Sequence, residues 1–290
     1  MKKRDKRSAG NVNETFRLLT GVMRALPDFL ILGGHKCGTS SLYYYLIQHP
    51  QVLPAAVTEV HFFDGQFDKG VRWYRSRFPL LPEMYYQRKR TSKDVITGEA
   101  TPYYLFYPHA PKRLAETVPR AKLIALLRNP VDRAYSQYLH NRRGKHHKAN
   151  SEPLSFEDAI AKESERLRGE LDKILADESY DSFAHRHYSY VQRGIYVDQL
   201  KAYEKFFDRS QILVIKSEDL FNKTIETYGE ILRFLSLDPY VPKDLSARNT
   251  DRYPKDELGA NHDGIYEELR SLFKPHNQRL YEYVQRDFGW

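Results

Sequence analysis

The sequence predicts an α/β fold in which a parallel β-sheet is covered by helices on both faces. Residues 123–127 and 212–215 form short, continuous apolar runs, which are typical of central strands buried on both sides. Residues 29–32 form a similar run that leads through glycines into a helical segment. Strand and helix patterns then alternate, and this order favours parallel strands joined by helical crossovers.

The first elements follow from apolar spacing and from prolines. Residues 1–27 are expected to form a basic N-terminal arm and a short helix that Pro27 ends, and residues 28–290 a single domain. The run at 29–32 is the first strand, and the helix that follows it spans 39–48. A second strand is expected at 95–99.

The central strand at 123–127 is followed by Pro130, which is favoured in the first turn of a helix, here reaching about residue 141. Residues 142–153 are polar, basic and loop-like. Apolar spacing predicts helices at 156–175, 191–207 and 225–235, with a strand at 212–215 between the last two. Residues 238–263 carry three prolines and many charges, so they are expected to form a long loop, and 265–285 one or two helices interrupted at Pro275.

The composition limits the possible partners and compartments. Lys and Arg number 46 against 38 Asp and Glu, an excess that favours anionic ligands but is too diffuse to indicate nucleic acid. Cys37 is the one cysteine, so no intramolecular disulfide requires an oxidising compartment. No long apolar run follows the basic N-terminus, so no signal peptide or membrane span is expected. A cytoplasmic protein is the simplest interpretation, and a trimmed ectodomain is the alternative.

The loop after the first strand, residues 33–41, has the composition of a phosphate-binding turn. It reads Gly-Gly-His-Lys-Cys-Gly-Thr-Ser-Ser and opens a helix, so backbone N–H groups and a positive helix end meet at one place. Gly33 and Gly38 have the spacing of a Walker A loop, but Thr39 stands where that motif has lysine. The lysine lies inside the loop, at Lys36. A tight turn without a ligand is the competing interpretation.

The end of the central strand also differs from a nucleoside triphosphatase. Such enzymes place an acidic residue there to help hold Mg²⁺, whereas this chain has Arg128. Ser136 follows about two helical turns later, so the side chains of Arg128 and Ser136 can bind a second phosphate. A nucleotide with phosphates on both the 5′ and 3′ oxygens would occupy both phosphate-binding sites, which indicates 3′-phosphoadenosine 5′-phosphosulfate. The alternatives are an ion pair of Arg128 with Asp132 and a purely helical role for Ser136.

These motifs resemble those of the sulfotransferase family. Residues 33–42 resemble its 5′-phosphosulfate loop, and residues 126–136 (Leu-Leu-Arg-Asn-Pro-Val-Asp-Arg-Ala-Tyr-Ser) resemble its 3′-phosphate motif. Residues 59–64 (Glu-Val-His-Phe-Phe-Asp) are similar to the catalytic segment of the carbohydrate branch, which includes the heparan sulfate N- and 3-O-sulfotransferases. The similarity extends from about residue 27 to the end, and it implies a P-loop-type sheet.

The resemblance also implies roles for single residues. Lys36 is expected to stabilise the departing charge, Glu59 to act as general base, and His61 to orient that base or the acceptor. Arg128 and Ser136 are expected to hold the 3′-phosphate. The remaining residues expected to bind the donor are the loop members Gly34, His35, Cys37, Gly38, Thr39, Ser40 and Ser41, together with Arg193, Arg248 and Arg252. Cys37 is interpreted as a small loop residue rather than a nucleophile.

The resemblance implies adenosine 3′,5′-bisphosphate as the product, no metal, and an acceptor hydroxyl or amine. The acceptor is expected to be a carbohydrate, a small metabolite or a carrier-bound hydroxyl, as in bacterial polyketide and olefin pathways. Two lysines of the carbohydrate branch are replaced, by Thr58 and Ala100, which weakens the expectation of a heavily anionic acceptor. A P-loop kinase or triphosphatase and a non-catalytic module that binds anionic polymers are the alternatives.

Overall fold

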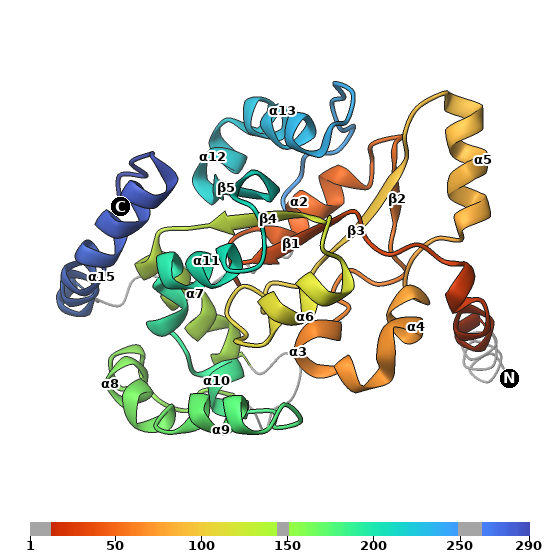
Figure 1. Cartoon of the computed structure of the whole chain (residues 1–290). Coiled ribbons are helices and arrows are strands. Elements are labelled where there is room, and N and C mark those ends of the chain that lie inside the picture. The colour runs from red at the N-terminus through yellow and green to blue at the C-terminus, as the bar shows by residue number, and fades with distance from the viewer. Residues whose placement is uncertain (1–12, 144–150, 249–262) are drawn as a thin grey trace, which may run out of the picture.

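The computed structural model describes residues 13–143, 151–248 and 263–290 (Figure 1). The predicted donor contact of Arg252, most of the basic run after Arg142, and the greater part of the expected loop at 238–263 therefore lie outside the described residues. Among the described helices none is both long and apolar enough to cross a bilayer. Cytoplasmic localisation stays a prediction.

A five-stranded, entirely parallel sheet forms the centre of the domain, with the strand order β2-β3-β1-β4-β5. The strands are β1 (Phe29–Gly33), β2 (Val52–Pro54), β3 (Ile96–Ala100), β4 (Lys122–Leu127) and β5 (Ile212–Lys216). Four of them lie at the predicted places, and the predicted fold class is confirmed. The edge strand β2 was not predicted, because three residues ending in proline give no apolar pattern.

Helices surround this sheet and fill the connections between its strands. Residues 13–19 are helical, and this helix ends before the 3₁₀ turn at 21–23 rather than at Pro27. The helices that follow are α2 (Thr39–Leu46), α3 (Phe62–Gly65), α4 (Gly70–Arg75), α5 (Leu81–Thr91), α6 (Ala110–Thr117), α7 (Pro130–Arg142), α8 (Phe156–Arg166), α9 (Glu170–Ala176), α10 (Phe183–His187), α11 (Tyr196–Glu204), α12 (Ser217–Asn222), α13 (Thr224–Leu235) and α15 (Asp263–Val284). Single 3₁₀ turns are η1 (Gly21–Met23), η2 (Phe67–Lys69), η4 (Gln192–Gly194) and η5 (Arg209–Gln211).

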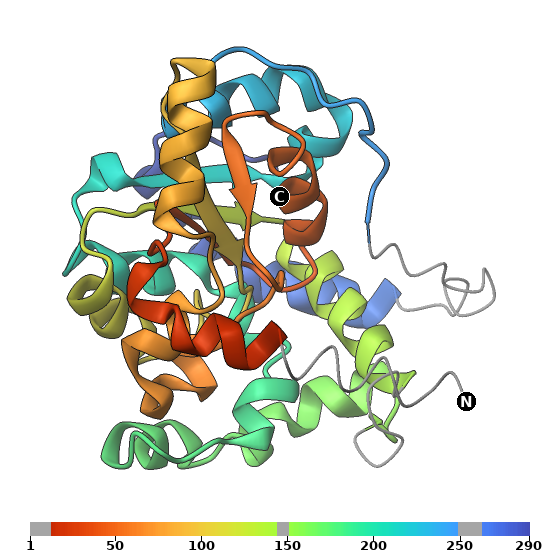
Figure 2. The ribbon, with the colours of Figure 1, turned by 90° about the vertical axis from the view of Figure 1, so that its right-hand side faces the viewer.

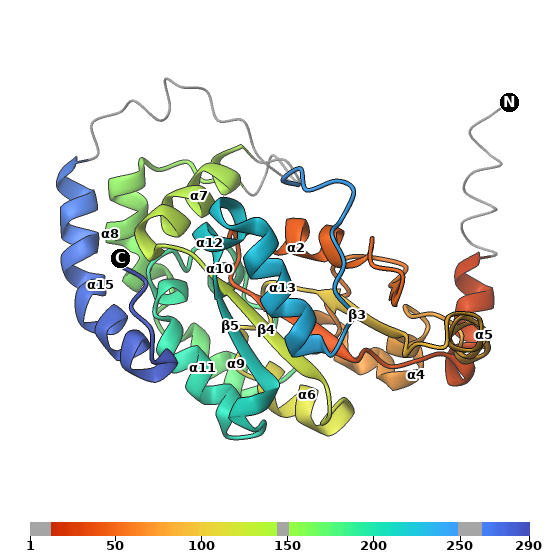
Figure 3. The same ribbon diagram turned by 90° about the horizontal axis from the view of Figure 1, so that it is seen from above.

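Both faces of the sheet are buried, as the continuous apolar strands predict. Leu30, Leu123 and Val214 point to one face, where α6 and α11 cover them. Their neighbours Ile31, Ile124 and Ile215 point to the other face, under α2, α12 and α13 (Figures 1 and 3). A smaller apolar cluster joins α7, α8 and α15 beside the sheet.

Two helix predictions need correction. The helical pattern at 156–175 is divided into α8 and α9, because Gly169 adopts a left-handed conformation between them. The interruption expected at Pro275 is absent, since α15 continues through the proline. Leu269, Phe273 and Leu280 are buried on both sides of Pro275, so tertiary packing maintains the helix across it.

The parallel order brings the carboxyl ends of β3, β1 and β4 side by side. The Gly34 N–H donates to the carbonyl of Leu126 at 2.6 Å, which joins the loop after β1 to the carboxyl end of β4. The Leu105 N–H donates to the carbonyl of Leu32 at 2.9 Å, which joins the loop after β3 to β1. The three loops were expected to converge on one site, and this arrangement confirms it.

Candidate active site at the carboxyl edge of the sheet

The loop between β1 and α2 has the backbone of an anion-binding turn. Lys36 adopts φ +66°, and Gly38, the N-cap of α2, adopts φ +88°. A Cβ atom on Gly38 would lie 2.8 Å from the ring of Phe221, so the turn fits only glycine there. No side chain caps the N-terminus of α2, so the positive helix end and the loop backbone fit a bound 5′-phosphate.

Buried hydroxyl groups hold the loops after β1 and β4. The Ser217 hydroxyl donates to the carbonyl of Cys37 at 2.7 Å, and the Tyr196 hydroxyl donates to the carbonyl of Arg128 at 2.8 Å. Burial raises the pKa of the Cys37 thiol to about 11, so the thiol stays protonated at neutral pH. The interpretation of Cys37 as a loop residue rather than a nucleophile agrees with this environment.

His35 points into the domain from the loop. Its ring contacts the His140 ring edge-on, with centroids 5.7 Å apart. Burial lowers the pKa of His35 well below its usual value, and the nearby charge of Arg193 lowers it further. The ring is therefore neutral at physiological pH, so any contribution of His35 to donor binding comes through its backbone or through a neutral ring.

Arg128 follows β4 directly, and Ser136 lies buried in α7. The start of α7 is fixed by Asn129, whose side chain accepts hydrogen bonds from the N–H groups of Val131 and Asp132. Across the part of the chain that the structure describes, Arg128 forms no ion pair with Asp132 or with another carboxylate. The structural alternative for Arg128 therefore finds no support, and its guanidinium is available to an anion.

The segment after β2 carries a chain of charged side chains. His61 Nε2 lies 3.3 Å from Glu59 Oε2, and His61 Nδ1 lies 2.8 Å from Asp64 Oδ2. Asp64 is buried and also accepts a hydrogen bond from Arg186 at 3.0 Å. Glu59 is the exposed end of this chain, with 43% of its side chain accessible, so it can reach an acceptor.

The two carboxylates keep His61 protonated. Desolvation alone would lower the pKa of this imidazole, but the hydrogen bonds to Asp64 and Glu59 raise it to about 10. The hydrogen bond and charge of His61 in turn lower the pKa of Asp64, against the effect of burial. The His61 imidazolium lies beside Glu59 and orients that carboxylate.

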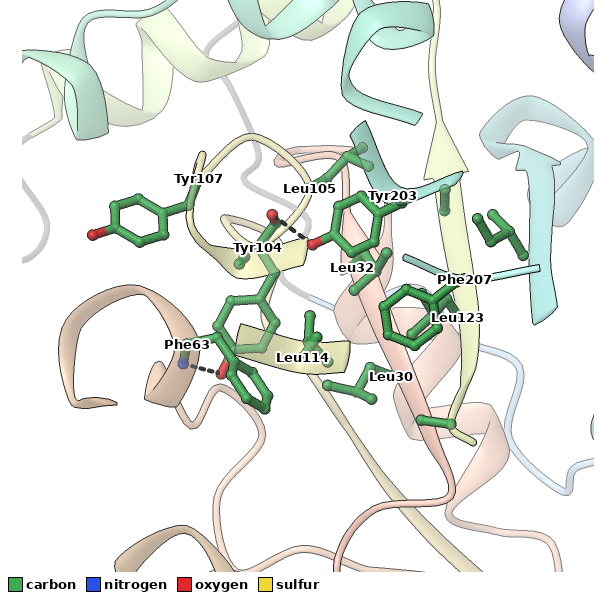
Figure 4. Close-up of a cluster of buried hydrophobic side chains, with 14 of the residues drawn as sticks. Leu30, Leu32, Phe63, Tyr104, Leu105, Tyr107, Leu114, Leu123, Tyr203 and Phe207 are labelled. Atoms are coloured by element: carbon green, nitrogen blue, oxygen red, sulfur yellow. Dashed lines mark hydrogen bonds between the residues drawn. The ribbon is translucent and has the colours of Figure 1, made fainter. Parts of the chain in front are cut away.

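A buried carboxylate, Glu99, joins the Glu59 segment to β3. Its oxygens accept hydrogen bonds from the hydroxyls of Tyr74 and Thr101, both at 2.6 Å, and from the Val60 N–H at 3.2 Å. The Tyr104 hydroxyl accepts hydrogen bonds from the backbone N–H groups of Phe62 and Phe63. The Tyr203 hydroxyl donates to the Tyr104 carbonyl (Figure 4). Burial raises the pKa of Glu99 to about 7.

Three residues predicted to bind the donor are engaged within the protein. Arg193 is buried and donates to the carbonyls of His185 and Arg186. The Arg248 guanidinium lies 3.6 Å from the centroid of the Tyr44 ring and pairs with Asp244. The Ser41 hydroxyl is buried and accepts a hydrogen bond from the Arg248 N–H at 2.9 Å. Donor contacts of Ser41, Arg193 and Arg248 stay predictions.

Comparison with known proteins decides the family. The model of the sulfotransferase domain matches residues 26–254. The chain belongs to the sulfotransferase family. It is an enzyme that depends on 3′-phosphoadenosine 5′-phosphosulfate, and the predicted family is confirmed.

Relatives of this sulfotransferase include enzymes that act on carbohydrates. Human heparan sulfate glucosamine 3-O-sulfotransferase 3A1 is 30% identical over 292 residues, which cover 94% of this chain and 64% of the human protein. The membrane-associated sulfotransferase kil1 of Dictyostelium discoideum is 26% identical over 353 residues, covering 100% of this chain and 72% of kil1. A sulfotransferase structure from Alicyclobacillus acidocaldarius is 33% identical, covers 91% of this chain and 98% of its own, and superposes with a TM-score of 0.62.

Sequence reasoning missed Asp64, Glu99 and Arg186 as parts of the sulfotransferase site. Asp64 could have been found, because it follows His61 by three residues, the spacing of neighbours on one helical turn. Arg186 is distant in sequence and gave no signal. Within the described ranges, no three His, Cys, Asp or Glu side chains gather as metal ligands, and independence from metal stays a prediction.

Proposed function

We propose that this sulfotransferase moves the sulfuryl group to an acceptor hydroxyl or amine, with Glu59 as the general base. Glu59 takes the acceptor proton while the acceptor atom forms its bond to sulfur. The bond between sulfur and the bridging oxygen of the 5′-phosphate breaks in line, and adenosine 3′,5′-bisphosphate leaves. Lys36 stabilises the negative charge on that departing oxygen.

The observation that carries the proposal is the chain Glu59–His61–Asp64 at the same edge of the sheet as the phosphate loop. A contact of 3.3 Å with the His61 imidazolium orients the exposed Glu59 carboxylate. The loop and Arg128 supply cationic and N–H groups for a donor with charge at both ends. A kinase would need a lysine at position 39 and an acid at position 128, and the chain has Thr39 and Arg128.

The proposed acceptor is a hydroxyl of a carbohydrate or small metabolite that is not heavily anionic. The relative that acts on heparan sulfate glucosamine supports a sugar. Ala100 ends β3 at the site and is buried, and Thr58, whose carbonyl accepts the Ala100 N–H, is exposed. Neither side chain supplies the cation that a heavily sulfated chain would need.

A labelled-sulfate transfer assay tests this proposal. The wild-type enzyme and Glu59→Gln are given the labelled donor with panels of sugars, phenols and carrier-bound hydroxyls. In Glu59→Gln the carboxamide has the shape of the carboxylate that it replaces but is a far weaker base. The variant should retain nucleotide affinity while losing ~10²–10⁴-fold in transfer rate. Transfer by the variant at the wild-type rate would remove Glu59 from the mechanism. A wild type that binds heparin and has no affinity for adenosine 3′,5′-bisphosphate would favour the anionic-polymer module.

A further inference from the structure

The face that holds the N-terminal helix, α4 and α5 exposes an unusual number of large apolar side chains. Leu19 and Val22 are 65% and 62% accessible, and Tyr85 and Tyr86 are 61% and 65% accessible. Phe16 and Met23 are also more than half exposed. Monomeric proteins rarely leave so many large apolar groups in water on one face without a partner.

The segments that carry these side chains are joined to one another. Arg72 of α4 donates to the carbonyls of Leu18 and Leu19, and Arg24 pairs with Leu80, the residue before α5, in a β-bridge. The N-terminal helix and α5 lie on the same side of the molecule in Figures 1 and 2. We call this surface, made of Phe16, Leu19, Val22, Met23, Tyr85 and Tyr86 with the cations around them, the apolar–basic face.

Positive charge is concentrated on the same segments. Residues 13–24 and 69–94 contain ten Lys and Arg against three Asp and Glu, an excess of seven, whereas the whole chain has an excess of eight. Lys69, Arg72, Arg88, Lys89 and Arg90 are exposed there. The Lys89 ammonium lies 5.5 Å from the centroid of the exposed Tyr85 ring, so cation and aromatic side chain are presented together.

We propose that the apolar–basic face docks this enzyme onto an anionic lipid surface. Exposed apolar side chains enter the boundary between headgroups and acyl chains, while Lys and Arg contact the anionic headgroups. Tyrosines suit that boundary because the ring is apolar and the hydroxyl is wet. A soluble polyanion would use the cations but would gain nothing from Leu19 or Val22, and this difference favours lipid.

Docking in this way leaves the catalytic edge free. Residues 21–28 and 81–95 lead into the amino ends of β1 and β3, whereas the phosphate loop follows the carboxyl end of β1. The segments that carry the exposed apolar side chains therefore lie toward the amino ends of the strands, and the phosphate loop lies toward their carboxyl ends. A membrane-bound enzyme would keep its site open to an acceptor in water.

Co-sedimentation of the full chain with vesicles tests the proposal. Vesicles of phosphatidylcholine with a fraction of phosphatidylserine should bind the enzyme, and pure phosphatidylcholine should bind it at least tenfold more weakly, about the effect of losing two headgroup contacts. The double variant Leu19→Ser/Val22→Ser should lose about tenfold in binding to anionic vesicles. The double variant Lys89→Glu/Arg90→Glu should lose more than tenfold.

Leu175→Ser/Val241→Ser is the matched control, because these side chains are 54% and 60% exposed in other elements. It should bind vesicles like the wild type. Affinity for adenosine 3′,5′-bisphosphate should be unchanged in every variant and in the presence of vesicles. The proposal is overturned if the wild type does not bind anionic vesicles. It is also overturned if heparin displaces the wild type from the vesicles while Leu19→Ser/Val22→Ser binds those vesicles as tightly as the wild type. The second result would make the face a polyanion site.

Discussion

Asp64 shows how much of the site depends on a residue that never reaches the substrate. It is buried, it bonds His61 on one side and Arg186 on the other, and it keeps the imidazole charged beside Glu59. The sequence predicted Glu59 and His61 from a motif, but it could not show that a second carboxylate completes the pair. Charge coupling of this kind depends on distances that a sequence pattern does not contain.

Replacing Asp64 with asparagine should move the alkaline limb of activity to lower pH. Against desolvation, Asp64 and Glu59 together raise the pKa of His61 to about 10, so the loss of Asp64 should lower that pKa toward the usual value near 6.5. Arg186 keeps Asp181 at 2.9 Å, so the fold should survive. The measurement is kcat against pH, with NMR titration of His61, and Asp68→Asn on the exposed surface is the control. An unshifted alkaline limb would show that His61 is not held charged by Asp64.

Replacing Lys36 with alanine should remove most of the transfer rate, about 10²–10³-fold, because the departing oxygen loses its cation. The loop should remain folded, since the left-handed turn at Gly38 and the hydrogen bond from Ser217 to the Cys37 carbonyl stay as they are. Single-turnover kinetics with labelled donor provide the measurement, and Lys205→Ala, at an exposed position far along the chain, is the control. A near wild-type rate in Lys36→Ala would exclude this role.

Glu99 should make folding stability fall as pH rises from about 4.5 to 7. Its folded pKa is raised to about 7, so within this window the unfolded chain releases the proton first, and the unfolded state gains stability relative to the native one. The effect should be on the order of 3 kcal/mol between those limits. Urea unfolding at several pH values should show this component in the wild type and in Glu83→Gln but not in Glu99→Gln. If the stability of Glu99→Gln fell with pH as steeply as that of the wild type, the pH dependence would come from another group.

At the scale of elements, the sequence predicted the helices and strands whose own residues carry a clear apolar or capping pattern. β4 is a continuous apolar run, and α7 begins with Asn129 and Pro130, so both were found at nearly the right bounds. β2 and α5 were missed, since β2 has three residues and α5 buries only Met84. The continuity of α15 through Pro275 was missed because packing, which the sequence does not display, overrides the helix-breaking tendency of proline.

The N-cap of α7 should connect stability with donor affinity. Asn129→Ala removes two hydrogen bonds at the start of α7 and should cost about 1 kcal/mol of folding free energy. Because α7 carries Ser136 and begins directly after Arg128, affinity for adenosine 3′,5′-bisphosphate should also fall several-fold. Ser155→Ala removes the corresponding cap of α8, away from the phosphate loops, and should cost similar stability without loss of affinity. Equal affinity of the two variants for adenosine 3′,5′-bisphosphate would show that the cap of α7 does not affect donor binding.

At the scale of the whole molecule, the parallel sheet explains why residues far apart in sequence act together. The strand order β3-β1-β4 places the Glu59 segment, the phosphate loop and Arg128 at one edge, and this convergence was predictable from the alternation of strands and helices. The apolar–basic face was not predictable, because its exposed side chains come from segments with no clear periodicity. The central claim is that cations and N–H groups at this edge recognise a nucleotide with a phosphate at each end.

Calorimetric titration in the presence of a metal chelator tests that claim most directly. Wild-type enzyme should bind adenosine 3′,5′-bisphosphate at least tenfold more tightly than adenosine 5′-monophosphate, since a charge-assisted contact contributes about 1.5–3 kcal/mol. In Arg128→Ala the two ligands should bind almost equally. Equal binding of the two ligands by the wild type, or a requirement for Mg²⁺ and a triphosphate, would contradict the account.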